Sequence, residues 1–144
     1  MRRMAMAALS AVGIAAAAGQ VNAQQTIFNL DLIGSDTEGG QCKVVFDAQN
    51  RLGFDIAQAQ FEVYILDPAR QFKGSYALSL PAIQAGKRKI LKFSLPPPCD
   101  QIGRLVSNGF TSCTGDDGAD RLKDCADGLR MSSTRPIPFN DDAD

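Results

Sequence analysis

The 144-residue sequence contains no histidine, no tryptophan and only two tyrosines. Without histidine, Ser-His-Asp and Cys-His catalysis are excluded, together with haem ligation by histidine and most catalytic zinc sites. The sequence also lacks GxSxG, P-loop and GxGxxG motifs, which mark common hydrolases and nucleotide-binding proteins. The low aromatic content argues against a platform on which sugars stack. We therefore expect a protein that is not an enzyme and binds no cofactor.

The chain has no apolar run long enough to cross a bilayer, which takes about 20 residues. Its start instead combines Arg2 and Arg3, a short apolar run over residues 5–18, and the small-x-small site Val21-Asn22-Ala23. This order of features predicts a signal peptide over residues 1–23. No second hydrophobic segment follows, so we expect a soluble mature protein with no membrane span, located in the periplasm or secreted.

No basic excess is present that would indicate a nucleic-acid partner. Removal of residues 1–23 leaves 13 basic and 16 acidic side chains, a net charge of −3. Eight of the acids lie in the last thirty residues, in an apparent surface loop and a tail where they cannot line a glycosidase cleft. The length predicts one domain over residues 24–140, followed by an acidic tail over 141–144.

The four cysteines lack the CxxC spacing of thiol oxidoreductases and of most zinc sites. They are Cys42, Cys99, Cys113 and Cys125, all beyond the predicted signal peptide. An even number of cysteines in an exported chain indicates two disulfides.

Apolar residues alternate with polar ones at period two through most of the chain, which is typical of half-buried strands. The clearest sets are Phe28-Leu30-Leu32, Val44-Phe46-Ala48, Phe61-Val63-Ile65 and Leu91-Phe93-Leu95. Turn-forming stretches separate them, and shorter candidates bring the total to about seven strands, the last in "TRPIPF" at 134–139. The pattern predicts an all-β, Ig-like antiparallel β-sandwich with one short helical insert near the C-terminus.

The helical insert includes the stretch "CTGDDGADRLKDC" at residues 113–125. Leu122, Cys125, Ala126 and Leu129 have helical spacing; we expect Asp116 or Asp117 to cap the helix and Gly128 to end it. Asp116, Asp117 and Asp120 are also hard oxygen ligands that would suit calcium. Their spacing does not match an EF-hand, so capping is favoured and a calcium site stays an alternative.

The stretch "FEVYILDPARQFKGSYALSLPAIQAGKRKILKFSLP" resembles the middle of bacterial Ig-like modules of the FxLYD type. The matching residues are Tyr64, Leu66, Asp67, Gly86 and Phe93, and the likeness covers about a third of the mature chain. The resemblance implies a sandwich fold. The four cysteines and the Asp-rich insert depart from the family's pattern.

The expected layout favours one cysteine pairing. Cys42 begins the second strand, and Cys99 immediately precedes the sixth. In an Ig-like sandwich these strands lie in opposite sheets and run the same way, so a Cys42–Cys99 bridge is favoured and Cys113–Cys125 closes its own loop. The pairings 42–113 with 99–125, and 42–125 with 99–113, remain open.

The only basic cluster comprises Lys87, Arg88, Lys89 and Lys92. Such residues either bind an acidic partner or protect an exposed strand from unwanted pairing. Arg121 and Lys123 of the insert are further candidates for recognition. We expect a binding or adaptor module that recognises an envelope or secreted protein through an edge strand or end loops. The alternatives are an inhibitor of a secreted hydrolase and a calcium-dependent structural module.

Overall fold

A computed structural model describes residues 12–14 and 26–139. Apart from residues 12–14, the predicted signal peptide lies outside the described residues, as does the predicted acidic tail at 141–144. The strands are β1 (Ile27–Glu38), β2 (Gln41–Arg51), β3 (Ile56–Leu66), β4 (Phe72–Leu80), β5 (Arg88–Leu95), β6 (Arg104–Gly115) and β7 (Leu129–Ser133). The helices are the 3-10 turn η1 (Cys99–Gln101) and α1 (Leu122–Gly128). No helix in the described ranges is long and apolar enough to cross a membrane.

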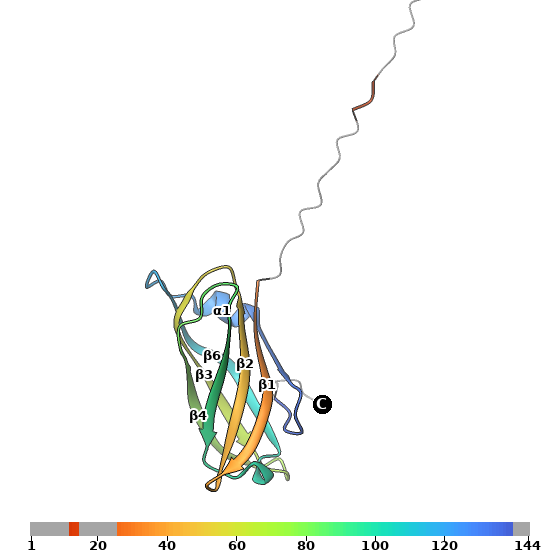
Figure 1. Cartoon of the computed structure of the whole chain (residues 1–144), viewed down its shortest axis with the longest axis vertical. Coiled ribbons are helices and arrows are strands. Elements are labelled where there is room, and N and C mark those ends of the chain that lie inside the picture. The colour runs from red at the N-terminus through yellow and green to blue at the C-terminus, as the bar shows by residue number, and fades with distance from the viewer. Residues whose placement is uncertain (1–11, 15–25, 140–144) are drawn as a thin grey trace, which may run out of the picture.

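The strands form two sheets that pack face to face as a sandwich (Figure 1). One sheet has the order β5-β2-β1-β7 and the other has the order β4-β3-β6. The predicted all-β sandwich with a short helix near the C-terminus is confirmed. Its purely antiparallel character was wrong, because β7 pairs parallel with β1 from Phe28–Leu129 to Leu32–Ser133.

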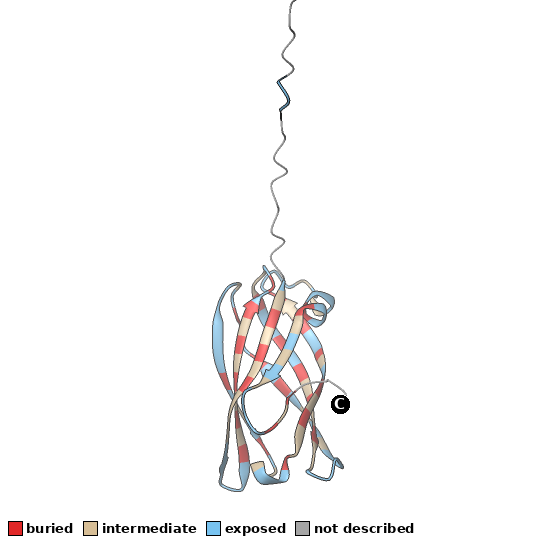
Figure 2. Cartoon of the chain, turned by 90° about the vertical axis from the view of Figure 1, so that its right-hand side faces the viewer, coloured by how far each residue is buried: buried red, intermediate tan, exposed pale blue. Residues whose placement is uncertain are grey.

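The core lies between the sheets and follows from the period-two alternation of the sequence. Buried residues recur at every second position of the central strands (Figure 2). Phe46 packs edge-to-face against Phe61 and Phe139, with ring centroids 6.1 and 5.1 Å apart. These rings come from both sheets and from the chain after β7, so one apolar cluster joins all three.

The last strand lies earlier in the sequence than predicted. Residues 134–137 form bends, and β7 occupies Leu129–Ser133 directly after the helix. Pro136 and Pro138 have no backbone N–H to donate to a ladder, which explains why "TRPIPF" does not form a regular strand. Phe139 still reaches the core, where it is fully buried and forms an isolated bridge with Leu105 of β6.

A disulfide joins Cys42 at the start of β2 to Cys99 in η1, with a Cα–Cα distance of 4.7 Å. The three prolines at 96–98 carry the chain from β5 in one sheet to β6 in the other. Cys42 N–H donates to the Pro97 carbonyl at 2.9 Å, which holds this crossover against β2. The favoured cysteine pairing is therefore the one that the structure contains, together with Cys113–Cys125.

Candidate functional site

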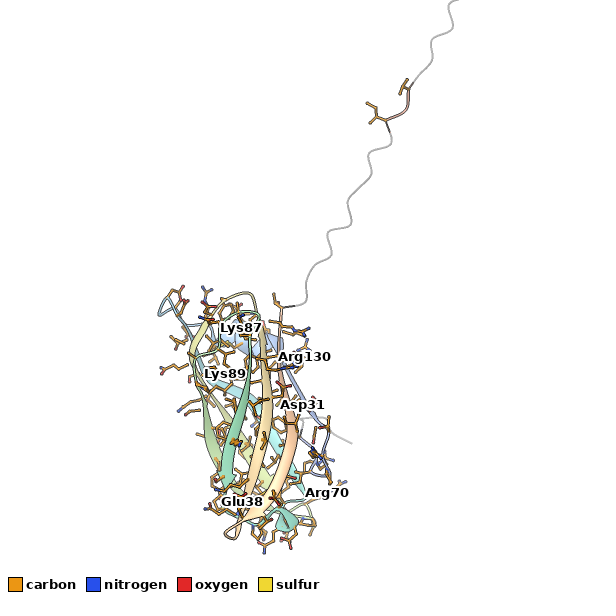
Figure 3. All side chains as sticks on the ribbon, viewed as in Figure 1. Asp31, Glu38, Arg70, Lys87, Lys89 and Arg130 are labelled. Atoms are coloured by element: carbon orange, nitrogen blue, oxygen red, sulfur yellow. A yellow bond between two sulfur atoms is a disulfide. The ribbon has the colours of Figure 1, made fainter. Side chains whose placement is uncertain are left out.

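The predicted basic cluster lies along an outer strand of the sandwich. In the described part of the chain β5 pairs with β2 and with no strand on its other side. Lys87 directly precedes β5, and Arg88, Lys89 and Lys92 belong to it; we call these four residues the basic edge. All four are exposed. Figure 3 shows Lys87 and Lys89 close together toward one end of the molecule.

The side chains of β5 alternate between the core and the outer face of the sheet. Leu91 and Leu95 are buried, opposite Phe46 and Cys42 of β2. Arg88, Ile90 and Lys92 have the opposite parity, so they point outward. Ile90 stands between the two cations and is 52% exposed, an unusual position for a large apolar side chain. The outer face of β5 therefore presents a cation, an apolar side chain and a second cation in that order.

The backbone of β5 has unpaired hydrogen-bonding groups on its free side. Asn50 N–H donates to the Lys87 carbonyl at 2.9 Å, and Asn50 lies opposite Lys87 in the extended register of β2 and β5. In an antiparallel ladder only every second residue bonds to the neighbouring strand. Residues 87, 89, 91 and 93 therefore face β2. The N–H and C=O groups of Arg88, Ile90 and Lys92 point away from the sheet.

Little negative charge offsets the basic edge. Arg88 Nε lies 3.0 Å from Asp47 Oδ1 on β2, yet the Arg88 side chain remains 60% exposed. This contact is an ion pair by distance without a well-aligned hydrogen bond, since that buried oxygen has no hydrogen-bond partner among the described residues. Within the described residues, Lys87, Lys89 and Lys92 form no ion pair within 4.0 Å. The surface is thus cationic and open to a partner.

Two hollows flank the outward-facing cations. The first hollow, about 330 Å³, is lined by Gln49, Arg51, Gly86, Lys87 and Arg88 and by no carboxylate. The second hollow, about 600 Å³, lies beside a bulge at Gly34 on β1 and contains Lys43, Lys92 and Arg135 together with Asp36 and Glu38. Both hollows have a positive formal charge, and the first has the larger excess.

The insert, residues 113–128, packs onto one end of the sandwich. The Cys113–Cys125 disulfide ties α1 to β6, and the helix residues Cys125 and Gly128 are buried. The helix starts later than predicted: Arg121 occupies the N-cap position without a side-chain cap. Neither Asp116 nor Asp117 caps it, because both lie in the tight turn before Asp120, whose carboxylate accepts from Leu122 N–H at 2.9 Å. Of the four residues with helical spacing, Leu122, Cys125 and Ala126 lie in α1, and Leu129 begins β7.

Most charges of the insert are engaged within it. The pKa of Asp117 is lowered because Ala119 N–H donates to its carboxylate, with a further contribution from Arg121. Arg121 also lies 5.1 Å above the Phe54 ring, so it fastens the insert to the sandwich. Lys123 donates to Asp127 at 2.6 Å, and this hydrogen bond raises the pKa of Lys123. Arg121 therefore holds the insert in place, whereas Lys123 remains exposed.

The predicted calcium ligands do not form a coordination sphere. In the parts of the chain that are described, no three Asp, Glu, His or Cys side chains gather in a group that could hold a metal ion. Asp117 pairs with Arg121, and Asp120 bonds to the helix backbone. The calcium alternative thus gains no support from the geometry.

Sequence reasoning missed the residues that join the basic edge from other strands. Arg51, Lys43 and Arg135 are distant from Lys87–Lys92 in the sequence. Arg51 and Lys43 reach the two hollows because β2 pairs with β5, and Arg135 reaches the second hollow from the bend after β7. The alternation along β2 predicts part of this arrangement, because it places the Lys43 side chain on the outer face of the sheet. The register between β2 and β5, which the sequence does not contain locally, is needed to place it beside Lys92.

Comparisons with known proteins extend to the fold alone. No protein-family model and no curated protein sequence matches the chain, so the FxLYD-type resemblance finds no support. The solved structure of IrmA from Escherichia coli is similar with a TM-score of 0.55 and 8% sequence identity. The match covers 77% of this chain and 95% of IrmA. At this identity the likeness supports a shared β-rich architecture and carries no functional assignment.

Proposed function

We propose that this protein is an exported, non-enzymatic binding module that recognises an envelope or secreted protein through the free edge of β5. One observation carries the proposal: the eight-residue outer strand β5 has unpaired backbone groups along its free side, and on its outer face Ile90 lies exposed between the exposed cations Arg88 and Lys92. An extended segment of a partner can add to such an edge as a further strand, with main-chain hydrogen bonds supplying affinity.

The cations of the basic edge fit an acidic partner and disfavour a second copy of the chain. Two β5 strands pairing edge to edge would place Lys and Arg side chains opposite one another, which destabilises a strand pair. An acidic segment would meet opposite charges at the same positions. The other two long outer strands, β4 and β6, contain one basic residue each, Lys73 and Arg104. The pairing of β4 with β3 shifts register near Gly74, and β6 already forms isolated bridges with Phe139 and Asp120. We therefore assign recognition to β5.

The experiment compares proteins captured from the native envelope by the tagged mature chain and by the variant Ile90→Pro. Proline removes the free N–H of residue 90 without removing a hydrogen bond to β2, since that N–H points away from the sheet. We expect a specific partner with the wild type and its loss with Ile90→Pro. Arg70→Glu, an exposed charge change in the turn at the opposite end of the molecule, is the control and should retain the partner (Figure 3). A partner that Ile90→Pro retains, or no specific partner at all, would contradict the proposal.

Export itself is tested by the N-terminus of the protein recovered outside the cytoplasm. Cleavage after Ala23 would leave Gln24 as the first residue. The two disulfides support this proposal, because such bonds persist in oxidising compartments. N-terminal sequencing that finds Met1 intact in that fraction would contradict it.

The inhibitor of a secreted hydrolase remains a second candidate because the tip of the insert is exposed and internally ordered. Asp116, Asp117 and Gly118 are exposed, and Gly118 N–H donates to the Gly115 carbonyl at 3.0 Å. The hairpin that contains them projects beside α1 (Figure 1). A preorganised loop loses little entropy on binding. If the captured partner is a hydrolase, inhibition that is lost on replacing residues 116–118 and retained in Ile90→Pro would favour this candidate.

A further inference from the structure

We infer that the partner segment carries the pattern acidic-x-apolar-x-acidic, with these three side chains on one face of the added strand. This inference rests on the proposed function of the β5 edge and specifies the chemistry that the edge selects. It follows because the same three residues, Arg88, Ile90 and Lys92, have both free backbone groups and outward-pointing side chains.

Arg88, Ile90 and Lys92 determine the positions in the pattern. Residues directly opposite one another on paired strands share a face, so the residue opposite Ile90 meets an exposed apolar side chain. The residues two positions before and after it meet Arg88 and Lys92. The pattern is symmetric, so it holds for parallel and antiparallel addition alike.

The two hollows accept the acidic groups. Arg88 and Lys92 are four positions apart on an extended strand, a distance of about 13 Å, which matches the separation of acidic residues at i and i+4 on the added strand. Arg51 and Lys87 join Arg88 in the first hollow, which no carboxylate lines; of these three cations, Arg88 alone has an ion pair among the described residues, with Asp47 at 3.0 Å. Lys43 and Arg135 join Lys92 in the second, but Lys43 already donates to Ser94 at 2.6 Å and Arg135 Nε to the Ile33 carbonyl. The acid at the first hollow should therefore contribute more to affinity.

The test uses three synthetic peptides of equal length and composition with a strand-forming background. The matched peptide has Glu at i and i+4 and Ile at i+2. The face-shifted peptide moves both Glu residues by one position relative to Ile, which places them on the opposite face. The third has one Glu at i and the other at i+1, so only one can reach a hollow. Affinities for the mature chain are measured by fluorescence anisotropy at low and physiological salt.

We expect the matched peptide to bind roughly tenfold more tightly than the face-shifted one, since two cross-strand charge pairs distinguish them. A double variant, Arg88→Glu with Lys92→Glu, should reverse the preference in favour of the same peptide with Lys in place of both Glu residues. Arg70→Glu should bind like the wild type. Ile90→Pro should weaken every peptide, because it acts on the backbone pairing that all of them share.

The outcomes separate the inference from the proposed function. Equal binding of matched and face-shifted peptides, all lost in Ile90→Pro, would overturn the pattern and leave recognition by the edge standing. If none of the three peptides binds and Ile90→Pro still abolishes capture of the envelope partner, the pattern would again be overturned and recognition by the edge would stand. Peptide binding unaffected by Ile90→Pro would overturn both. Binding of a polyanion such as polyphosphate, with no measurable peptide binding, would show that the cations serve an anionic polymer and would also overturn both.

Discussion

At the residue scale, Asn50 places the beginning of the basic edge. Its side chain is fully buried; Nδ2 donates to the Phe54 and Ile83 carbonyls, each at 2.9 Å, and Oδ1 accepts from Leu52 N–H at 3.0 Å. Its backbone bonds to Gly86 and Lys87, at 2.7 and 2.9 Å. Asn50 thus holds the loop after β2 against the segment before β5, which lines the first hollow. A buried polar residue with complete hydrogen bonding specifies a unique local structure.

Asn50→Ala should lower the free energy of unfolding by about 3 kcal/mol, because it leaves two carbonyls and one N–H without their partner. Chemical denaturation of the wild type and the variant measures the difference. Asn50→Asp is nearly the same size but replaces the donor with an oxygen facing two carbonyls. It should be at least as destabilising, and an unperturbed Asn50→Asp variant would show that the amide donor is unimportant.

Asp117 in the turn before α1 should give a defined pH response. Its pKa is lowered below the ordinary value of 3.8, chiefly by the hydrogen bond from Ala119 N–H. Because the pKa is lower in the folded state, the contribution of Asp117 to stability is complete above pH 3.8 and disappears as the pH falls through the folded-state pKa. Carboxyl-carbon NMR titration should place the Asp117 midpoint below 3.8. Arg121→Gln should move this midpoint upward, and no movement would contradict the ion pair.

At the scale of elements, the period-two pattern predicted which segments form strands better than it predicted which strands pair with one another. The alternation in β1, β2, β3 and β5 is strong, and the structure has all four strands. The last strand was predicted in "TRPIPF" but lies at Leu129–Ser133. The local sequence could not show this, because β7 is a short strand that is stabilised by its parallel pairing with β1. The second hollow likewise depends on the bulge between Leu32 and Gly34, where a side chain at residue 34 would crowd Val45 Cβ at 3.2 Å.

The two disulfides should differ in their contribution to stability. In the chain-entropy model, the Cys42–Cys99 bridge, with a separation of 57 residues, is worth about 4 kcal/mol and the Cys113–Cys125 bridge, with a separation of 12, about 3 kcal/mol. Paired Cys→Ala variants measured by denaturation test the order. Because α1 makes its main contacts with β6 and β1, Cys113→Ala/Cys125→Ala should retain binding at the basic edge. Loss of binding in a variant that remains folded would show that the insert takes part in recognition.

At the scale of the whole molecule, one apolar cluster holds the two sheets together, and two disulfides fasten η1 to β2 and α1 to β6. Residues of both sheets and of α1, together with Phe139, belong to the same core, so the oxidised domain should unfold in a single transition. Together the disulfides contribute about 7 kcal/mol in the chain-entropy model, which is comparable with the whole stability of a small domain, about 5–15 kcal/mol. Reduction should therefore lower the melting temperature sharply. A fully reduced chain that melts at the oxidised temperature would mean that the core alone suffices and that the fold does not depend on an oxidising compartment.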